Sequence, residues 1–499
     1  MTLSADFIVV GAGSAGCVLA AELIRRDAGS VLLVEAGPNE KHPLVTMPFG
    51  LVWLMGSRRD WRYTSAPQSA LNGRHVAIPR GRMVGGSGSI NSMVWFRGRA
   101  DDFDGWGVRG WSWASVVPAF EAVEARIQPQ VFKDAHPLIA KLSPLFGANR
   151  NAPPSPERES AGVFRFNMSG GRRNSAADAF LRPALSESRH LTVITGREVR
   201  RIVIEKDCAN AVEFADGTKA RAQKGVVLSA GSIGSPALLL KSGIGPRQDL
   251  HRSGVPLVLD APGVGANLHD HPAVGLQFDG EGYGLTFGQA PAWLGAPFQY
   301  AFGKRGRFAS PTVEGGLFFN ARGTDRTPDI QSHVIPFKLA RRGRRYAYGS
   351  GFFADVCLCR PRSRGRLSLT PEGLRIDLGL LSDPADLEDM VAGVARLRAL
   401  LADAGLDAVE RFPGAHVTSD EAIADHIRGH CSTAYHPVGT LRMGMDEAAP
   451  VSEKLAVKGI DGLWVADASI MPRVTSANTN APSMMIGYRA AALIAEAAI

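Results

Sequence analysis

Near the amino end of the chain, three glycines and one acidic residue stand at spacings that suit the binding of a dinucleotide. They occur around the stretch DFIVVGAGSAGC, whose apolar run Phe7 to Val10 predicts a buried parallel strand. The first glycine permits a tight turn, the second lets the backbone approach a pyrophosphate, and the third lets the next helix pack closely on the strand. The acid that ends the following strand can accept hydrogen bonds from ribose hydroxyls. The motif alone does not separate FAD from NAD. The residues expected to bind the dinucleotide here are Gly11, Gly13, Ser14, Ala15, Gly16, Glu35 and Ala36.

A histidine in the last part of the chain could accept a proton. His436 stands directly before Pro437 in TAYHPVGTLRMG, and Asn478 and Asn480 follow in TSANTNAP. Histidine has an unperturbed pKa of about 6.5, which suits general-base catalysis at neutral pH. Most single histidines are surface residues or structural hydrogen-bonding groups, so the His-Pro pair by itself leaves both interpretations open.

Two further groups contain residue types that bind metals. His269 and His271 in GVGANLHDHP have the spacing of two ligands on one strand, but no neighbouring residues complete a set. A structural role near a domain junction is therefore expected for them, and no metal. The cysteines lack a second pair at zinc spacing, which favours reduced thiols; they are Cys17, Cys208, Cys357, Cys359 and Cys431.

Composition narrows the class of protein. The chain has 499 residues, of which 45% are hydrophobic and 21% charged, as in an ordinary globular protein. The net charge of +8 comes from scattered basic residues without a nucleic-acid-binding motif, so no nucleic-acid partner is expected. No apolar run approaches the roughly 18 residues of a membrane span. The strand pattern that begins at Asp6 leaves no room for a signal peptide, and a cytoplasmic location is expected.

Four segments resemble the glucose–methanol–choline (GMC) oxidoreductase family of flavoproteins, in that family's order. The first three are RGRMVGGSGSINSMVWFRGRADDFDGW (80–106), GVVLSAGSIGSPALLLKSGIGP (225–246) and APGVGANLHDHP (261–272). The fourth spans 435–491, from YHPVGTLRMG to GLWVADASIMPRVTSANTNAPSMMIGYRAA. The cofactor that this resemblance implies is FAD.

The resemblance also assigns contacts to the cofactor. In the family, the GGSGSIN loop lines the pyrophosphate and the isoalloxazine. Val199 is expected to contact adenine through its backbone, and Asp467 to accept a ribityl hydroxyl, which is compatible with a helix N-cap role. Asn480 is expected either at the pyrimidine end of the flavin or as a residue that structures its loop. The positions carried over from the family are Arg82, Gly85, Gly86, Asn91, Val94, Val199, Ala230, Asp467, Ala468 and Asn480.

The position that some relatives use to attach the flavin covalently differs in this chain. Those relatives carry a histidine there, whereas this chain has Ile90. Isoleucine has no nucleophilic atom, so the FAD is expected to be non-covalent.

The resemblance further implies the chemistry. His436 occupies the position of the family's catalytic histidine, which takes the alcohol proton while hydride passes to flavin N5. Asn478 matches the second catalytic residue and is expected to donate to the alkoxide, and Tyr435 is expected to border the substrate. The expected enzyme is an FAD-dependent alcohol oxidoreductase that converts a primary alcohol to the aldehyde, and an aromatic or heteroaromatic alcohol is favoured. The closest branches are choline-dehydrogenase-like and hydroxymethylfurfural-oxidase-like, and the acceptor is oxygen or a quinone-like carrier. The alternative is a hydroxynitrile-lyase-like enzyme on the same fold, with FAD that takes no redox part.

The fold expected is α/β, with a Rossmann-like FAD-binding domain and a second, α+β domain built on an antiparallel sheet backed by helices. Alternating strands such as PDIQSHVIPF (328–337) and GRLSLTP (365–371), and a helix-like stretch at 385–406, indicate the second domain. The FAD-binding domain is expected in three parts, at 1–155, 190–275 and 431–499, and the substrate domain at 156–189 and 276–430.

Overall fold

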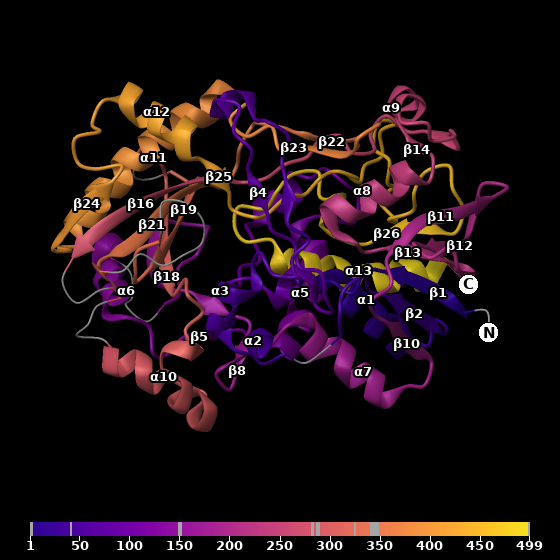
Figure 1. Cartoon of the computed structure of the whole chain (residues 1–499), viewed down its shortest axis with the longest axis horizontal. Coiled ribbons are helices and arrows are strands. Elements are labelled where there is room, and N and C mark those ends of the chain that lie inside the picture. Colours follow the sequence, from indigo (N-terminus) through magenta and orange to yellow (C-terminus); the bar gives the residue numbers. More distant parts are fainter. Residues whose placement is uncertain are drawn as a thin grey trace.

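Two sheets lie side by side along the long axis of the molecule and divide the fold into two halves (Figure 1). This computed structural model describes residues 3–39, 42–147, 152–280, 284–285, 290–323, 326–339 and 349–497. The amino and carboxyl ends both lie in the half on the right of Figure 1.

The first sheet holds the strand that precedes the glycine motif. Its order is β10-β2-β1-β13-β12-β11, and β26 also pairs with β13. The strands β10, β2, β1, β13 and β26 run parallel, whereas β12 and β11 are antiparallel. All four residues of β2 are buried, as expected of a parallel strand covered on both faces. The bounds are β1 Leu3–Val10, β2 Val31–Val34, β10 Leu191–Ile194, β11 Val199–Glu205, β12 Cys208–Phe214, β13 Lys219–Leu228 and β26 Leu463–Val465.

Helices from both ends of the chain cover this sheet. Helix α1 packs against α13, so the carboxyl-terminal helix lies beside the glycine motif (Figure 1). Gly487 of α13 makes this contact close, because a Cβ there would lie 2.3 Å from the carbonyl oxygen of Ala15. The helices of this half are α1 Ser14–Arg25, α4 Ala100–Asp104, α5 Trp113–Ile127, α7 Arg182–Glu187, α8 Gly231–Lys241, α9 Arg247–Arg252 and α13 Asn480–Ala497.

The second sheet is antiparallel, in the order β24-β16-β21-β19-β18-β6, with β25 paired to β16. Helix α11 packs on β21, and α12 packs on α11 and β16, which leaves the other face of the sheet toward the first half. The bounds are β6 Ser160–Val163, β16 Pro272–Gly280, β18 Gly315–Phe319, β19 Ile330–Ile335, β21 Phe352–Leu358, β24 Ala408–Phe412, β25 Ser432–Thr433, α11 Pro384–Asp403 and α12 Asp420–His430.

Short elements complete the described chain. Of the remaining helices, α2 Pro43–Thr46 and α10 Ala290–Gly303 lie in the lower part of Figure 1, and α3 Leu51–Leu54 and α6 Pro137–Leu142 lie nearer its mid-height. The two-stranded pairs are β3 Tyr63–Thr64 with β4 Ala77–Ile78, β5 Gln130–Val131 with β7 Arg165–Phe166, β8 Met168–Ser169 with β9 Arg172–Arg173, β14 Ile244–Gly245 with β15 Leu259–Asp260, β17 Gly284–Leu285 with β20 Gly349–Ser350, and β22 Arg366–Thr370 with β23 Gly373–Asp377.

The α/β fold class with a second, antiparallel-sheet half is confirmed. The strand predicted at 365–371 is confirmed, but it does not join the large antiparallel sheet. It forms β22, which pairs with β23 in a separate two-stranded sheet and packs on α8 and α9. The domain boundaries stay a prediction. Among the described residues, no helix has the length and apolar character that a membrane crossing requires.

Candidate active site

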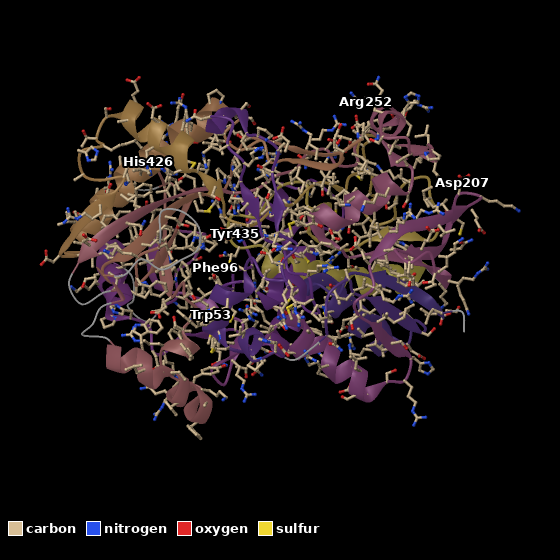
Figure 2. All side chains as sticks on the ribbon, in the orientation of Figure 1. Trp53, Phe96, Asp207, Arg252, His426 and Tyr435 are labelled. Carbon is tan, nitrogen blue, oxygen red and sulfur yellow. The ribbon has the colours of Figure 1, made fainter. Side chains whose placement is uncertain are left out.

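A cavity of about 790 Å³ lies between the two halves. Its wall combines the glycine motif of the first half with strands β16, β19 and β21 of the second, and with the loops that carry the His-Pro pair and the asparagines. Tyr435, which lines the cavity, lies near the middle of the molecule in Figure 2, whereas Asp207 lies at the outer tip of a hairpin. The cavity is therefore where a cofactor held by one half can meet a substrate held by the other.

The glycine motif has the geometry that its sequence predicts. Gly11 has φ +102°, and a Cβ there would lie 2.5 Å from the carbonyl oxygen of Ser229. A Cβ at Gly16 would lie 2.0 Å from the carbonyl oxygen of Gly11, so α1 could not pack this closely on β1 with any larger residue. Gly13 lines the cavity, and a Cβ there would lie 3.9 Å from the carbonyl oxygen of Ser229, an ordinary contact. The free N–H groups at the amino end of α1 are thus available to an anionic group.

Two buried carboxylates stand at strand ends beside this motif. Glu35 accepts hydrogen bonds from the backbone of Ala12 at 3.0 Å and Gly37 at 2.8 Å, while burial raises its pKa. Asp467 accepts from the backbone of Gly231 at 2.9 Å and of Ser469 at 2.8 Å, so it caps the short helix that follows it. Both side chains line the cavity with fixed orientations.

The residues around the amino end of α1 fit a flavin dinucleotide. The GGSGSIN loop comes so close that a Cβ at Gly86 would lie 2.7 Å from the Cα of Gly13. Asn480 accepts a hydrogen bond from Ser14 at 2.7 Å through its amide oxygen. Its amide nitrogen is buried and has no hydrogen-bond partner among the described residues, so a donor is left for a ligand. A bare-backbone cradle, helix N–H groups and this donor are what FAD requires of the chain.

Most of the residues predicted to contact the cofactor line the cavity, and three do not. Gly16 serves helix packing instead. Gly85 has φ +91° and shapes the loop, while its N–H donates to Ala12 at 2.7 Å. The Arg82 guanidinium lies 4.9 Å from the centre of the Trp61 ring and 3.7 Å from Glu198. The cavity-lining ones are Gly11, Gly13, Ser14, Ala15, Glu35, Ala36, Gly86, Asn91, Val94, Val199, Ala230, Asp467, Ala468 and Asn480.

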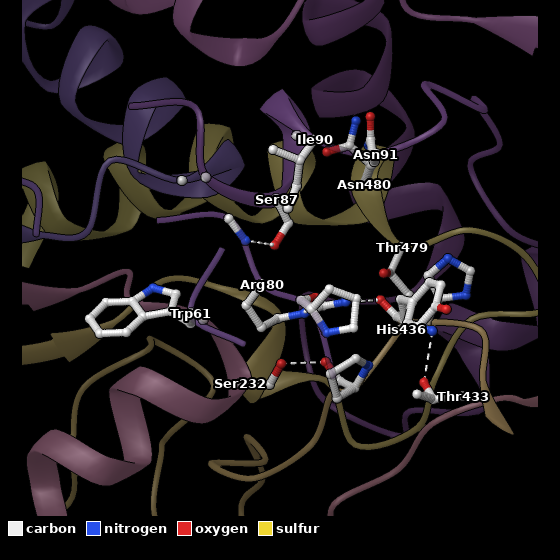
Figure 3. A pocket seen from close by; sticks show the side chains of 18 of the residues that line it. Trp61, Arg80, Ser87, Ile90, Asn91, Ser232, Thr433, His436, Thr479 and Asn480 are labelled. Atoms are coloured by element: carbon white, nitrogen blue, oxygen red, sulfur yellow. Dashed lines mark hydrogen bonds between the residues drawn. The ribbon is translucent and has the colours of Figure 1, made fainter. Parts of the chain in front are cut away.

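Ile90 and Asn91 lie together with Asn480 on one side of the close view in Figure 3. Ile90 is buried in a small apolar cluster with Leu54 and Met83, at the point where its loop borders the cavity. Arg173, which the sequence interpretation missed, donates to the Asn91 side chain at 2.6 Å and to the carbonyl of Gly88 at 3.1 Å. This buried guanidinium, whose pKa burial lowers to about 10, holds the loop in place.

The proposed proton acceptor and its amide neighbour meet at the cavity wall. The Asn478 amide nitrogen donates to Nε2 of His436 at 3.2 Å, and Gln331 of β19 donates to the Asn478 amide oxygen at 3.1 Å. With Gln331 donating to the Asn478 oxygen, the Asn478 nitrogen faces Nε2 of His436, and Nε2 accepts. The His436 nitrogen at the cavity wall therefore carries no proton and can act as a base.

A second histidine supports the first from behind. Nδ1 of His271 lies 3.0 Å from Nδ1 of His436, with the two rings nearly perpendicular at 84°. Asp270 accepts hydrogen bonds from the backbone N–H groups of both histidines, at 2.8 and 2.9 Å, and from the Thr433 hydroxyl. Burial raises the pKa of Asp270 to about 6, so it is ionised at neutral pH. One carboxylate thus fixes the backbones of the two histidines next to each other.

The backbone before His436 is held in an uncommon conformation. Tyr435 has φ +70°, which is rare for a residue with a bulky side chain. Arg80 donates to the Tyr435 carbonyl, and the Tyr435 N–H donates to the Thr433 hydroxyl at 2.7 Å. Figure 3 shows Arg80 between Trp61 and His436. These contacts over-determine the turn that aims the histidine at the cavity.

Electrostatics keep His436 neutral. Burial, together with His271, His333 and Arg80, lowers its pKa well below the usual value. Burial also lowers the pKa of His271 to about 4. Both rings are therefore neutral at physiological pH, and the proton shared between their Nδ1 atoms is on His436, since its Nε2 is an acceptor.

The sequence did not predict the residues that position His436 and Asn478. These are Asp270, Arg80, Gln331 and His271. The only indication in the sequence was the run Asp270-His271-Pro272, which follows the structural histidine His269. His269 bonds the carbonyl of Pro361 at 2.8 Å and the N–H of Val474 at 3.0 Å. In the described part of the chain, no cluster of histidine, cysteine or acidic side chains could hold a metal ion.

Comparison with known proteins adds independent information. Two family models, both described as GMC oxidoreductase, match residues 5–273 and 361–487. The alcohol dehydrogenase [acceptor] of Pseudomonas putida is 36% identical over 532 residues, covering 98% of this chain and 95% of that relative. An oxygen-dependent choline dehydrogenase of Rhizobium etli is 36% identical over 524 residues, with the same coverage of 98% and 95%.

Solved structures agree in fold. Pyridoxine 4-oxidase from Mesorbium loti superposes with a TM-score of 0.85 at 29% identity and covers 98% of both chains. A fungal aryl-alcohol oxidase superposes with a TM-score of 0.80 at 21% identity, with 99% of both chains covered, which bears on the fold alone.

Proposed function

This chain belongs to the GMC oxidoreductase family, and we propose that it oxidises a primary alcohol, with aromatic or heteroaromatic alcohols favoured, to the aldehyde. In general terms the enzyme is an FAD-dependent oxidoreductase that acts on alcohols. The proposal adds the type of alcohol and the residues that act on it. The observation that carries it is Nε2 of His436, an acceptor at the cavity wall that lies 3.2 Å from the amide nitrogen of Asn478.

His436 is proposed to take the proton of the alcohol hydroxyl at Nε2. Gln331 keeps the Asn478 amide from rotating, and the second N–H of that amide is proposed to donate to the developing alkoxide. The ring gains a positive charge, which the carboxylate of Asp270 stabilises from behind while Nδ1 stays bonded to His271. When bound, FAD supplies the acceptor for the hydride that leaves the alcohol carbon.

FAD would be held by the glycine motif, the GGSGSIN loop and the two strand-end carboxylates. The helix N–H groups and Gly13 would receive the pyrophosphate, and Glu35 a ribose hydroxyl. Ile90 offers no atom for a covalent bond, which supports non-covalent binding.

The aromatic preference has two supports. Phe353, Phe412 and Tyr435 line the cavity in its substrate half, and the Phe353 ring lies where a Cβ of Gly275 would be, 2.2 Å from its Cε2 atom. This makes a flat apolar wall. The structural relative named pyridoxine 4-oxidase, at 29% identity, is the second support, because its name indicates a heteroaromatic alcohol.

The test is an anaerobic screen of alcohols against the purified enzyme. Benzyl alcohol, pyridoxine and choline are mixed with it under nitrogen, and the flavin absorbance is followed. Bleaching by an aromatic alcohol is the expected result, with the matching aldehyde formed. If no alcohol bleaches the flavin and a cyanohydrin releases cyanide, the lyase alternative replaces this proposal.

The electron acceptor is oxygen or a quinone-like carrier, and reoxidation distinguishes them. Enzyme reduced with alcohol is mixed with air-saturated buffer or with a soluble quinone under nitrogen. The faster reoxidant is the acceptor, and hydrogen peroxide forms only with oxygen.

A further inference from the structure

The substrate side of the cavity carries a second histidine–carboxylate pair, which the proposed chemistry does not use. In β19, Nδ1 of His333 lies 3.1 Å and 3.2 Å from the two carboxylate oxygens of Asp355 in β21. The backbone N–H of His333 donates to the same carboxylate at 2.6 Å. The two side chains are 11% and 14% exposed, and both line the cavity. The pair is nearly buried, and it faces the space that receives the substrate.

The strand sets the distance from this pair to the reacting centre. Gln331, which bonds the Asn478 amide, lies on the same strand two residues before His333. Side chains two residues apart point to the same face, about 7 Å from each other. The distance from Gln331, which bonds the Asn478 amide, to His333 is therefore similar to the length of a substituted aromatic ring.

Asp355 determines which nitrogen of His333 is left to bond a substrate. Because a carboxylate only accepts hydrogen bonds, Nδ1 of His333 donates to Asp355, and in the tautomer with its proton on Nδ1 the ring keeps a lone pair on Nε2. Nε2 has no hydrogen-bond partner among the described residues. The Gln277 side chain, diagonal to Asp355 on β16, lines the same part of the cavity. This end of the cavity thus presents an oriented acceptor.

Charge favours a neutral donor over an anion. Along the cavity wall, within the described residues, the arginines and lysine are Arg80, Arg197 and Lys241. Arg80 bonds the Tyr435 carbonyl, Arg197 pairs with Asp216, and Lys241 ends α8 in the FAD half. No such cation bonds Asp355 in the described structure, so a carboxylate on the substrate would meet a like charge there.

We propose that His333, oriented by Asp355, selects aromatic alcohols that carry a ring hydroxyl. Its Nε2 accepts a hydrogen bond from a hydroxyl on the far side of the ring from the alcohol that is oxidised, while Phe353 contacts the ring. The inference rests on the proposed oxidation of aromatic alcohols and adds the substituent that the site recognises.

The experiment compares kcat/KM for 3- and 4-hydroxybenzyl alcohol, benzyl alcohol and 4-(hydroxymethyl)benzoate. For the natural enzyme, we expect a ring hydroxyl to raise kcat/KM about tenfold over benzyl alcohol, mainly through KM, and the carboxylate to lower it. His333→Phe should remove the preference for the hydroxyl, so that the ratio of kcat/KM for hydroxybenzyl alcohol to that for benzyl alcohol in the same variant falls to about one. His333→Gln, which keeps a hydrogen-bonding group, should retain part of the preference. Asp355→Asn should relieve the discrimination against the carboxylate.

Several outcomes would overturn the inference. If His333→Phe and His333→Gln lower kcat/KM equally for all four alcohols, the pair is structural and does not read the substituent. If the natural enzyme turns over choline faster than any benzyl alcohol, Asp355 is a site for a cation instead. If no alcohol reduces the flavin of the natural enzyme, the proposed function itself fails, which is distinguishable from a lost preference.

Discussion

His271 and His436 meet nitrogen to nitrogen, with their Nδ1 atoms 3.0 Å apart and both backbones bonded to Asp270. One of two facing nitrogens must donate and the other accept. Since the Asn478 amide donates to Nε2 of His436, the donor is Nδ1 of His436 and the acceptor is His271. His271 thereby holds the Nδ1 proton of the His436 tautomer whose Nε2 can accept the alcohol proton.

Removing this acceptor should slow the reaction without removing the base. We expect His271→Phe to lower the rate of flavin reduction by about 10²-fold, because the His436 ring loses its fixed position and tautomer. His271→Asn, which keeps an acceptor near the same place, is the matched control and should lose less. Rapid-mixing absorbance under nitrogen measures both. Equal rates in His271→Phe and the natural enzyme would show that the pair does not position His436.

The two groups at the alcohol oxygen should both matter, and their effects should overlap. His436→Ala removes the base and should slow flavin reduction by about 10²–10⁴-fold. Asn478→Ala should cost less, because the base remains in place. In the double variant the losses should fall short of additive, since both groups act on one oxygen. FAD content and thermal unfolding serve as controls, and a His436→Ala enzyme that keeps FAD and the natural rate contradicts the mechanism.

The acid limb of the pH profile should lie lower than histidine ordinarily gives. Burial lowers the pKa of His436, so the ring stays neutral, and able to accept a proton, at pH values where a free histidine is already charged. We expect kcat/KM for benzyl alcohol to stay level as pH falls through 6.5, the unperturbed value, and to decline only below it. A decline centred at or above 6.5 would mean that another group controls the acid limb.

The flavin should leave the protein on denaturation. Ile90 is buried beside Leu54 and Met83 and has no atom that can bond the flavin. Acid precipitation should therefore release the yellow colour into the supernatant, which absorbance at the flavin band measures. Colour that stays in the pellet would indicate attachment through some other residue.

Most of the dinucleotide site could be predicted from the local sequence. The glycines at 11, 13 and 16 have the geometry expected of them because each role depends on neighbours within one strand–turn–helix unit. Strand β1 and helix α1 were recognisable for the same reason, since their apolar patterns repeat over a short stretch. The position of the Arg82 side chain could not be predicted in this way. It lies against Trp61 and Glu198 and does not line the cavity.

By itself the sequence determined the αβ unit that binds a dinucleotide, the missing nucleophile at Ile90 and the family to which His436 and Asn478 point. Only the tertiary structure decided what stands behind these two residues. Asp270 and His271 precede His436 by about 165 residues, and Gln331 precedes Asn478 by 147. Hydrogen bonds over such separations depend on strand pairing between β16, β19 and β21, and on the turn at Tyr435. A periodic pattern reports which face of a strand is buried, but it does not report which distant side chain that face will meet.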